Sequence, residues 1–326
     1  MAPRSPEACA RVWGITALCV VLALLPWLVN PFRVRVFTLT GIYTIAATGL
    51  TLFMGFTGQI SLAQAAFFGI GAYASGILMI AGLPFPLAFF AAGVITAVFA
   101  LSIGLPCLRA RGFYLAMATL GFMLSTTIIF KNAASLTGGV SGLGGIPPAS
   151  IGPVSFETFI PYYYLTWAVV AAVLYFAQHL TTSYSGLTFR AIANNELAAE
   201  SLGMNAYMYR LLSFAICASL AGIAGSLYAH LDRVIAPESF TFEESVIFLT
   251  MAVIGGLTSI YGGLIGAMVF TVIGEQLRSF ERGQVIIVGT ILIVMVIFLP
   301  RGAVSLPRTI AELVRRARRN RKPRGR

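Results

Sequence analysis

The chain has 326 residues, of which 58% are hydrophobic and 10% are charged, and its formal net charge at pH 7 is +11. A soluble domain carries about 25% charged residues. The composition therefore excludes a soluble enzyme, an intrinsically disordered chain and a disulfide-rich scaffold. We expect an all-α integral membrane protein built as a polytopic helix bundle.

Apolar stretches almost free of charged residues recur along the chain, and a membrane helix needs about 20 such residues. We expect about ten spans, and at least about eight, each crossing the hydrocarbon core. They lie at 12–30, 36–55, 61–81, 84–106, 112–130, 160–180, 211–230, 244–258, 261–278 and 283–300. Glycines interrupt 244–278, so each half there is expected to be short or bent, and 61–81 could be partly re-entrant.

The basic residues predict an orientation, because Lys and Arg gather in cytoplasmic loops. An N-terminus inside the cell places most of them, including the run at 315–322, on the cytoplasmic side. We therefore expect both termini to be cytoplasmic. Residues 1–30 would form an N-terminal segment with the first span, 31–300 the transmembrane domain and 301–326 a basic cytoplasmic tail. The loop 131–159 would be external and Gly-rich, and the loop 181–210 cytoplasmic.

The tail serves topology and attraction to anionic membrane lipids in the favoured interpretation. An RNA contact is the lesser alternative, and no nucleic acid is expected as a partner.

Several kinds of chemistry are absent from the sequence. Neither Lys131 nor Lys322 follows a phosphate-binding glycine loop, so the chain cannot bind ATP by itself in the usual way.

His179 and His230 lie far apart in sequence and are interpreted as interface residues rather than a metal pair, and no metal site is expected. No ionisable residue lies in a span core, which favours a pore-forming body energised by another protein. A neutral sodium site remains an alternative.

A polar run interrupts the apolar sequence near the start of the stretch 61–81. Thr57, Gln59, Ser61 and Gln64 bring four uncharged polar groups together. In a membrane such groups need partners. Structural hydrogen bonding and lining of a translocation path are both open interpretations.

Small residues recur at four-residue spacing within the spans, a pattern that lets helix backbones approach closely. The pairs and triplet are Ala65 with Gly69, Ala72 with Gly76, Ala218 with Gly222 and Ser226, and Gly262 with Gly266. We interpret them as helix-packing positions. Helices that slide or part during transport are the alternative.

The cytoplasmic stretch 188–205 has the pattern of an amphipathic helix, with Thr188 as its N-cap and Gly203 as its stop. Its apolar stripe is expected to comprise Phe189, Ile192, Ala199 and Leu202, with Arg190, Asn194, Glu196 and Glu200 at other positions. The stripe could lie on the bilayer, fold back onto the spans, or dock into a partner. The near balance of charge favours a protein partner.

Several motifs together resemble the LivM-type permease subunit of branched-chain amino-acid ABC importers. They are the runs 55–73, 111–122, 136–139, 190–204 and 252–267, and the resemblance covers roughly residues 35–300.

The resemblance implies that the helix at 190–204 docks into an ATP-binding subunit. In that family a Glu-Ala-Ala pattern is followed after three residues by Gly, which Ala198, Ala199 and Gly203 match here. The expected Glu position holds Leu197, and Glu196 stands one place earlier. The coupling residues would then be Arg190, Glu196, Ala198, Ala199, Leu202 and Gly203.

The resemblance further implies a second homologous permease, two ATP-binding subunits, a periplasmic substrate-binding protein and a place in the bacterial inner membrane. ATP and Mg would be held by the partner subunits, with no cofactor in this chain. Transport of urea or short amides, a self-sufficient channel or secondary carrier, and a non-transporting scaffold are the alternatives.

Overall fold

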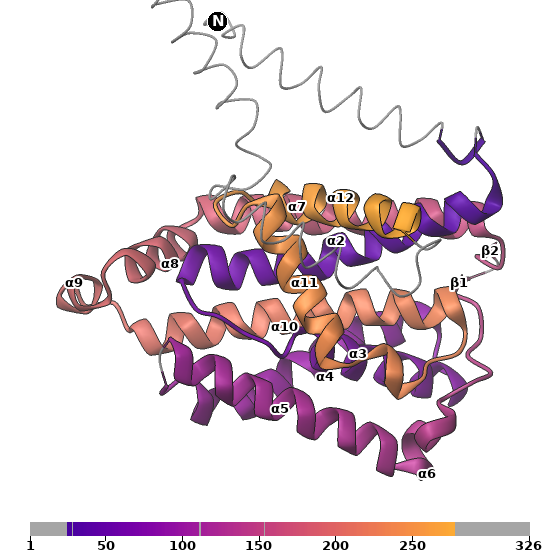
Figure 1. Cartoon of the computed structure of the whole chain (residues 1–326), viewed down its shortest axis with the longest axis horizontal. Coiled ribbons are helices and arrows are strands. Elements are labelled where there is room, and N and C mark those ends of the chain that lie inside the picture. The colour runs from indigo at the N-terminus through magenta and orange to yellow at the C-terminus, as the bar shows by residue number, and fades with distance from the viewer. Residues whose placement is uncertain (1–24, 28, 111, 153, 278–326) are drawn as a thin grey trace, which may run out of the picture.

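The computed structural model describes residues 25–27, 29–110, 112–152 and 154–277. Its long helices lie alongside one another in a bundle, and short elements join them at its two ends (Figure 1). In chain order the elements are α2 (Pro31–Thr57), α3 (Gln64–Ile80), α4 (Phe85–Cys107), α5 (Phe113–Asn132), α6 (Ala134–Thr137), η1 (Gly139–Ser141), β1 (Ser150–Ile151), β2 (Val154–Ser155), α7 (Phe159–Thr182), α8 (Tyr184–Asn194), α9 (Glu196–Ser201), α10 (Ala206–Asp232), η2 (Pro237–Ser239), α11 (Phe242–Gly255) and α12 (Tyr261–Leu277).

Five of the described helices are long and apolar enough to cross a membrane, namely α2, α4, α5, α7 and α10. Each coincides with an expected span, although its ends lie a few residues from the predicted ones. The structure agrees with the expected all-α membrane protein. The expected spans at 12–30 and 283–300 lie largely or wholly outside the described residues.

Two apolar helices are shorter than a full crossing requires. Helix α3 has 17 residues and α11 has 14, against the roughly 20 that a helix needs to span the hydrocarbon core. Helices α11 and α12 form a tight pair. A Cβ at Gly255 would overlap the carbonyl of Gly262, and a Cβ at Gly262 would overlap the carbonyl of Gly256. The expectation of short or bent halves at 244–278 is therefore confirmed for the described part of this stretch.

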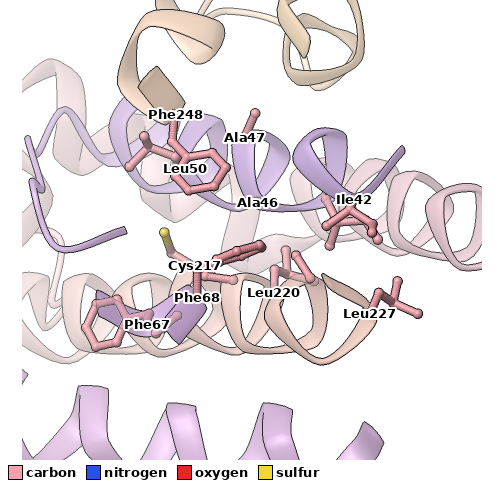
Figure 2. Close-up of a cluster of buried hydrophobic side chains, with 14 of the residues drawn as sticks. Ile42, Ala46, Ala47, Leu50, Phe67, Phe68, Cys217, Leu220, Leu227 and Phe248 are labelled. Carbon is pink, nitrogen blue, oxygen red and sulfur yellow. The ribbon is translucent and has the colours of Figure 1, made fainter. Parts of the chain in front are cut away.

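The core of the bundle lies where α2, α3, α10 and α11 meet. Side chains from all four helices are buried together there, including Leu50, Phe67, Leu220 and Phe248 (Figure 2). Helix α10 occupies the centre of the bundle, since it packs against α2, α3 and α4. Movement of α10 would therefore act on three neighbouring spans.

Glycines allow α10 to contact α3 through the backbone. A Cβ at Gly71 would overlap the backbone of Gly222, and a Cβ at Gly225 would overlap the carbonyl of Phe68. Such an approach replaces side-chain layers by direct van der Waals contact of backbones, the main source of helix association in lipid.

The connection 131–159 is folded rather than loose. It contains α6, η1 and a hairpin in which Ser150 pairs with Ser155, and Leu143 forms a bridge with Ile235 beyond the end of α10. His230 anchors the same connection, because its imidazole lies 3.1 Å from the carbonyl oxygen of Pro147 and 2.9 Å from the hydroxyl of Ser75. The Gly-rich loop is thus fastened to α3 and α10.

Candidate functional site

The chain is not helical between α2 and α3. Residues 58–63, called here the α2–α3 break, connect the end of α2 to a helix that begins deep inside the bundle. The Gln64 side chain at the start of α3 donates from Nε2 to the carbonyl oxygen of Ala46 at 2.7 Å. Ala46 lies 11 residues before the end of α2 at Thr57, which is about 16 Å along the helix axis. Gln64 therefore contacts α2 well inside that helix and not at its end.

Side chains of other helices partner the backbone around the break. The Leu62 amide donates to the hydroxyl of Thr119 on α5 at 3.0 Å, and the Ala65 amide donates to the hydroxyl of Ser245 on α11 at 3.0 Å. The hydroxyl of Ser61 accepts from the Ala63 amide at 3.3 Å. Non-helical backbone at membrane depth persists only where protein buries it or where it lines a water-filled cavity. At the break, hydroxyl groups of α5 and α11 supply these partners from within the protein.

The structure separates the four polar residues predicted near the break. Gln64 is fully buried, and its Oε1 accepts from the Cys217 thiol at 3.2 Å. Thr57 is buried and donates to the carbonyl oxygen of Phe53 at 2.5 Å. Gln59 is partly exposed, and its Oε1 has no hydrogen-bond partner within the described part of the chain. Gln64 and Thr57 thus act as internal hydrogen-bonding groups here, whereas the buried Oε1 of Gln59 is left without a partner among the described residues.

Helices α8 and α9 project beyond the ends of α2 and α10 (Figure 1). The predicted single helix is wrong, since Asn195 has extended backbone and begins a separate helix by accepting from the Ala198 amide at 3.1 Å. Thr188 is not an N-cap, because it lies inside α8 and its hydroxyl donates to the carbonyl oxygen of Tyr184. The helix begins instead after Ser183. The Asn-Asn pair before Glu196 was the available signal for the interruption.

Gly203 ends α9, as predicted. Its φ is +81°, its amide donates to the carbonyl oxygen of Glu200 at 2.9 Å, and the Met204 amide donates to that of Ala199 at 3.2 Å. This is the Schellman arrangement, which needs a residue that tolerates the left-handed region.

The extended residue Asn195 separates α8 from α9 and changes which side chains face the bundle. Phe189, Ile192 and Ala199 are buried as expected. Leu202 was expected in the same buried stripe, but it is 77% exposed, and Leu197 is 73% exposed. The prediction for Leu202 is wrong because the apolar stripe was assigned on one continuous helix, whereas α8 and α9 are separate helices. Two large apolar side chains therefore point away from the protein at the tip of the molecule.

Cations hold the two short helices to the bundle. The guanidinium of Arg190 lies 4.8 Å from the ring centroid of Phe56, near the end of α2. Oε1 of Glu196 lies 2.8 Å from Nη2 of Arg210, near the start of α10, and the two side chains form an ion pair. Glu196 is thus turned toward the bundle, while Ala198 and Glu200 are exposed beside the two leucines.

The histidines and cysteines of the described residues lie apart from one another. No group of three or more His, Cys, Asp or Glu side chains gathers there to hold a metal ion. The histidines do not meet, since His179 stacks on Tyr175 near the end of α7 and His230 binds Ser75 at the opposite end of the bundle. Cys107 and Cys217 carry free thiols, and Cys9 and Cys19 lie outside the described residues.

Comparison with known proteins assigns the chain to a family. The family described as "Branched-chain amino acid transport system / permease component" matches residues 32–298. The chain belongs to this family. The permease protein LivM of Salmonella typhimurium is 30% identical, with 90% of this chain and 75% of that protein covered. The permease protein LivH of the same organism is 28% identical, with 83% of this chain and 93% of that protein covered. The autoinducer 2 import permease LsrC of Escherichia coli is 26% identical, with 91% of this chain and 89% of that protein covered.

The protein is therefore a multi-pass transmembrane permease subunit, and its small residues can be placed in that context. A Cβ at Gly222 would overlap the Thr96 side chain of α4, and a Cβ at Gly266 would overlap the Met251 carbonyl of α11. At Gly262 it would overlap the Gly256 carbonyl. At Gly69 it would press on the aromatic rings of Phe130 and Phe240. We propose that these four glycines are packing positions of the permease.

Gln64→Leu tests whether this glutamine is structural or lines the path. We expect the variant to lower the free energy of unfolding by about 1–3 kcal/mol, because two buried hydrogen bonds are lost. The matched variant Gln59→Leu should change stability by no more than about 0.5 kcal/mol, since that side chain is partly exposed. Thermal unfolding of the purified permeases measures both. Equal stability of the two variants, with altered uptake by Gln64→Leu, would assign Gln64 to the path.

Proposed function

We propose that the chain is the transmembrane permease subunit of an ABC-type importer that carries branched-chain amino acids across the bacterial inner membrane. The observation that carries the proposal is the family match over residues 32–298, which includes the bundle, the α2–α3 break and α9. The names of the relatives LivM and LivH support the substrate class. On this proposal ATP is hydrolysed by partner chains, and this chain is not itself an enzyme.

The proposed topology has about ten spans with both termini in the cytoplasm, which follows the distribution of Lys and Arg. This orientation puts α8 and α9 in the cytoplasm and the connection 131–159 outside. The proposed assembly contains a second homologous permease, two ATP-binding subunits that hold ATP and Mg, and a periplasmic substrate-binding protein. The pairing of LivM and LivH among the relatives supports two permeases.

In the proposed mechanism α9 lies in a groove of an ATP-binding subunit. Leu197 and Leu202 are the apolar anchors of that contact, since both are largely exposed on the outer side of α9 and its C-cap. Closure of the ATP-binding subunits would displace α9 and open or close the path between the permeases.

The α2–α3 break would contribute to the wall of the path. Its uncharged polar groups suit an amino acid zwitterion, which needs hydrogen-bonding partners but would be trapped by a fixed charge. Gln59 is the side chain best placed for this role, because its Oε1 lacks a partner among the described residues.

A double substitution on α9 tests the docking role. Leu197→Glu with Leu202→Glu should abolish co-purification of the ATP-binding subunits, because two carboxylates would enter an apolar contact. Leu136→Glu is the matched control, since Leu136 is 62% exposed on α6 at the other end of the bundle and should leave co-purification unchanged. Undiminished capture of ATP-binding subunits by the double variant would contradict the docking role.

The substrate class needs a separate measurement. ATP-dependent uptake of labelled leucine, isoleucine or valine by proteoliposomes containing the full complex is the expected result. Uptake of urea or a short amide with none of these amino acids would overturn the substrate, and uptake by this chain without ATP-binding subunits would overturn the mechanism.

A further inference from the structure

A buried ion pair joins α9 to the base of α10. Glu196 is the first residue of α9, and Arg210 lies one turn inside α10. Nη2 of Arg210 and Oε1 of Glu196 are 2.8 Å apart, and the two side chains are 4% and 17% exposed. The pair Arg35–Asp232 at the opposite end of the bundle is far more open, with side chains 46% and 21% exposed.

Burial makes the two charges dependent on each other. A buried cation or anion that loses its partner is strongly unfavourable, because the desolvation cost remains while the attraction is gone. Nε and Nη1 of Arg210 are buried and find no acceptor among the described residues. Glu196 is therefore the group that compensates the guanidinium, and moving it away from Arg210 carries a large cost.

Few other interactions fix α9. It is six residues long, and its buried apolar contact is a small cluster of Ile192, Ala199 and Ala206. Its outer side chains, Leu197 and Leu202, are largely exposed in the described structure. The ion pair thus links α9 directly to a spanning helix.

Helix α10 leads from this pair to the centre of the molecule. Two turns beyond Arg210, the Cys217 thiol donates to Gln64 at the start of α3. Farther along, Gly222 and Gly225 contact the backbone of α3 without an intervening side chain. Contacts of this kind deform little, because packed backbones have no rotamers to adjust. A displacement at the base of α10 therefore reaches α3 and the α2–α3 break.

We propose that Glu196 and Arg210 form the link that carries movement of α9 into α10, and that Arg210 is a positioning residue of the transport cycle. The proposal rests on the proposed function for its role in transport. It also reassigns Glu196, whose carboxylate serves the permease itself and not a contact with the ATP-binding subunit.

Charge exchange tests the link in the purified permease without any transport assay. Glu196→Arg and Arg210→Glu should each raise the hydrogen-exchange rates of the α9 amides by about tenfold or more, because the helix loses its anchor. The double variant that carries both substitutions restores opposite charges and should return these rates to near the original values. Unchanged exchange in the single variants, or no recovery in the double variant, would overturn the anchor.

The complete complex in proteoliposomes tests the transmission. Each single variant should hydrolyse ATP while moving about tenfold less substrate per ATP, and the double variant should recover most of the original ratio. Arg35→Glu is the control, since its partner Asp232 lies at the other end and the ratio should stay unchanged. A normal ratio in the single variants would overturn the transmission role, even where the anchor is found. Failure of the unsubstituted complex to couple ATP to uptake would count against the proposed function instead, and the exchange measurement would still decide the anchor.

Discussion

Gly225→Ala is expected to prevent the bundle from assembling. The Cβ of the new alanine would overlap the carbonyl oxygen of Phe68 on α3 and press on the amide of Ala72. Both are backbone atoms, so no side-chain rotation relieves the overlap and α3 and α10 must separate. Overpacking of a well-packed core costs about 1–3 kcal/mol, and we expect at least the upper figure here because the backbone is the obstacle. The measurement is the amount of folded permease in detergent, by size-exclusion chromatography and thermal unfolding.

Gly121→Ala is the matched control for this substitution. Gly121 lies in α5 on an exposed face, and a Cβ there would meet no atom within 4 Å. Alanine is the better helix former by about 1 kcal/mol, so the control should be as stable as the original protein or slightly more so. A Gly225→Ala variant that folds as well as Gly121→Ala would show that α3 and α10 are not locked together as the structure has them.

The long spans could be predicted from the sequence because their cause is local. A run of about 20 apolar residues has to form a helix across a membrane, whatever surrounds it. Helices α4 and α7 therefore begin and end close to the predicted residues. The late start of α3 has a different cause. Two hydroxyls distant in sequence accompany it, since Thr119 accepts from the Leu62 amide in the break and Ser245 accepts from the Ala65 amide in the first turn of α3.

The residues of the candidate site could be predicted from the sequence, but the directions of their side chains could not. The sequence indicated that the polar groups at 57–64 need partners. Only the structure shows that Gln64 bonds to Cys217 and Ala46, while the Oε1 of Gln59 is buried without a partner among the described residues. In the same way the coupling motif was recognisable, but the direction of Glu196 depends on Arg210, fourteen positions later. Periodicity assigns faces only within one continuous helix, and Asn195 ends that helix.

These contacts make α10 the connection between α9 and the α2–α3 break. Helix α10 carries Arg210 beside α9 at its start and Cys217 beside the break near its middle. The two parts are therefore connected by a single rigid element. On the proposed function, a substitution that loosens the turn between α9 and α10 should stop transport without disturbing the spans.

Gly203 is the residue at which that turn can be tested, and Gly203→Pro should abolish uptake while leaving membrane insertion intact. Proline holds φ near −65° and lacks an amide hydrogen, whereas Gly203 has φ of +81° and donates to Glu200. The substitution therefore undoes the end of α9, at a local cost of roughly 3 kcal/mol. The spans should be unaffected, because Gly203 is exposed and a Cβ there would meet no atom within 4 Å.

Gly203→Asn separates loss of the turn from loss of glycine itself. Asparagine enters the left-handed region more readily than other side chains and keeps the amide that Glu200 accepts, so most of the uptake should remain. Uptake of labelled leucine by cells and the quantity of permease in their membranes are to be measured for both variants. Normal uptake by Gly203→Pro would exclude the docking role of α9, since a helix whose end has been remodelled could not present Leu197 and Leu202 in the same positions.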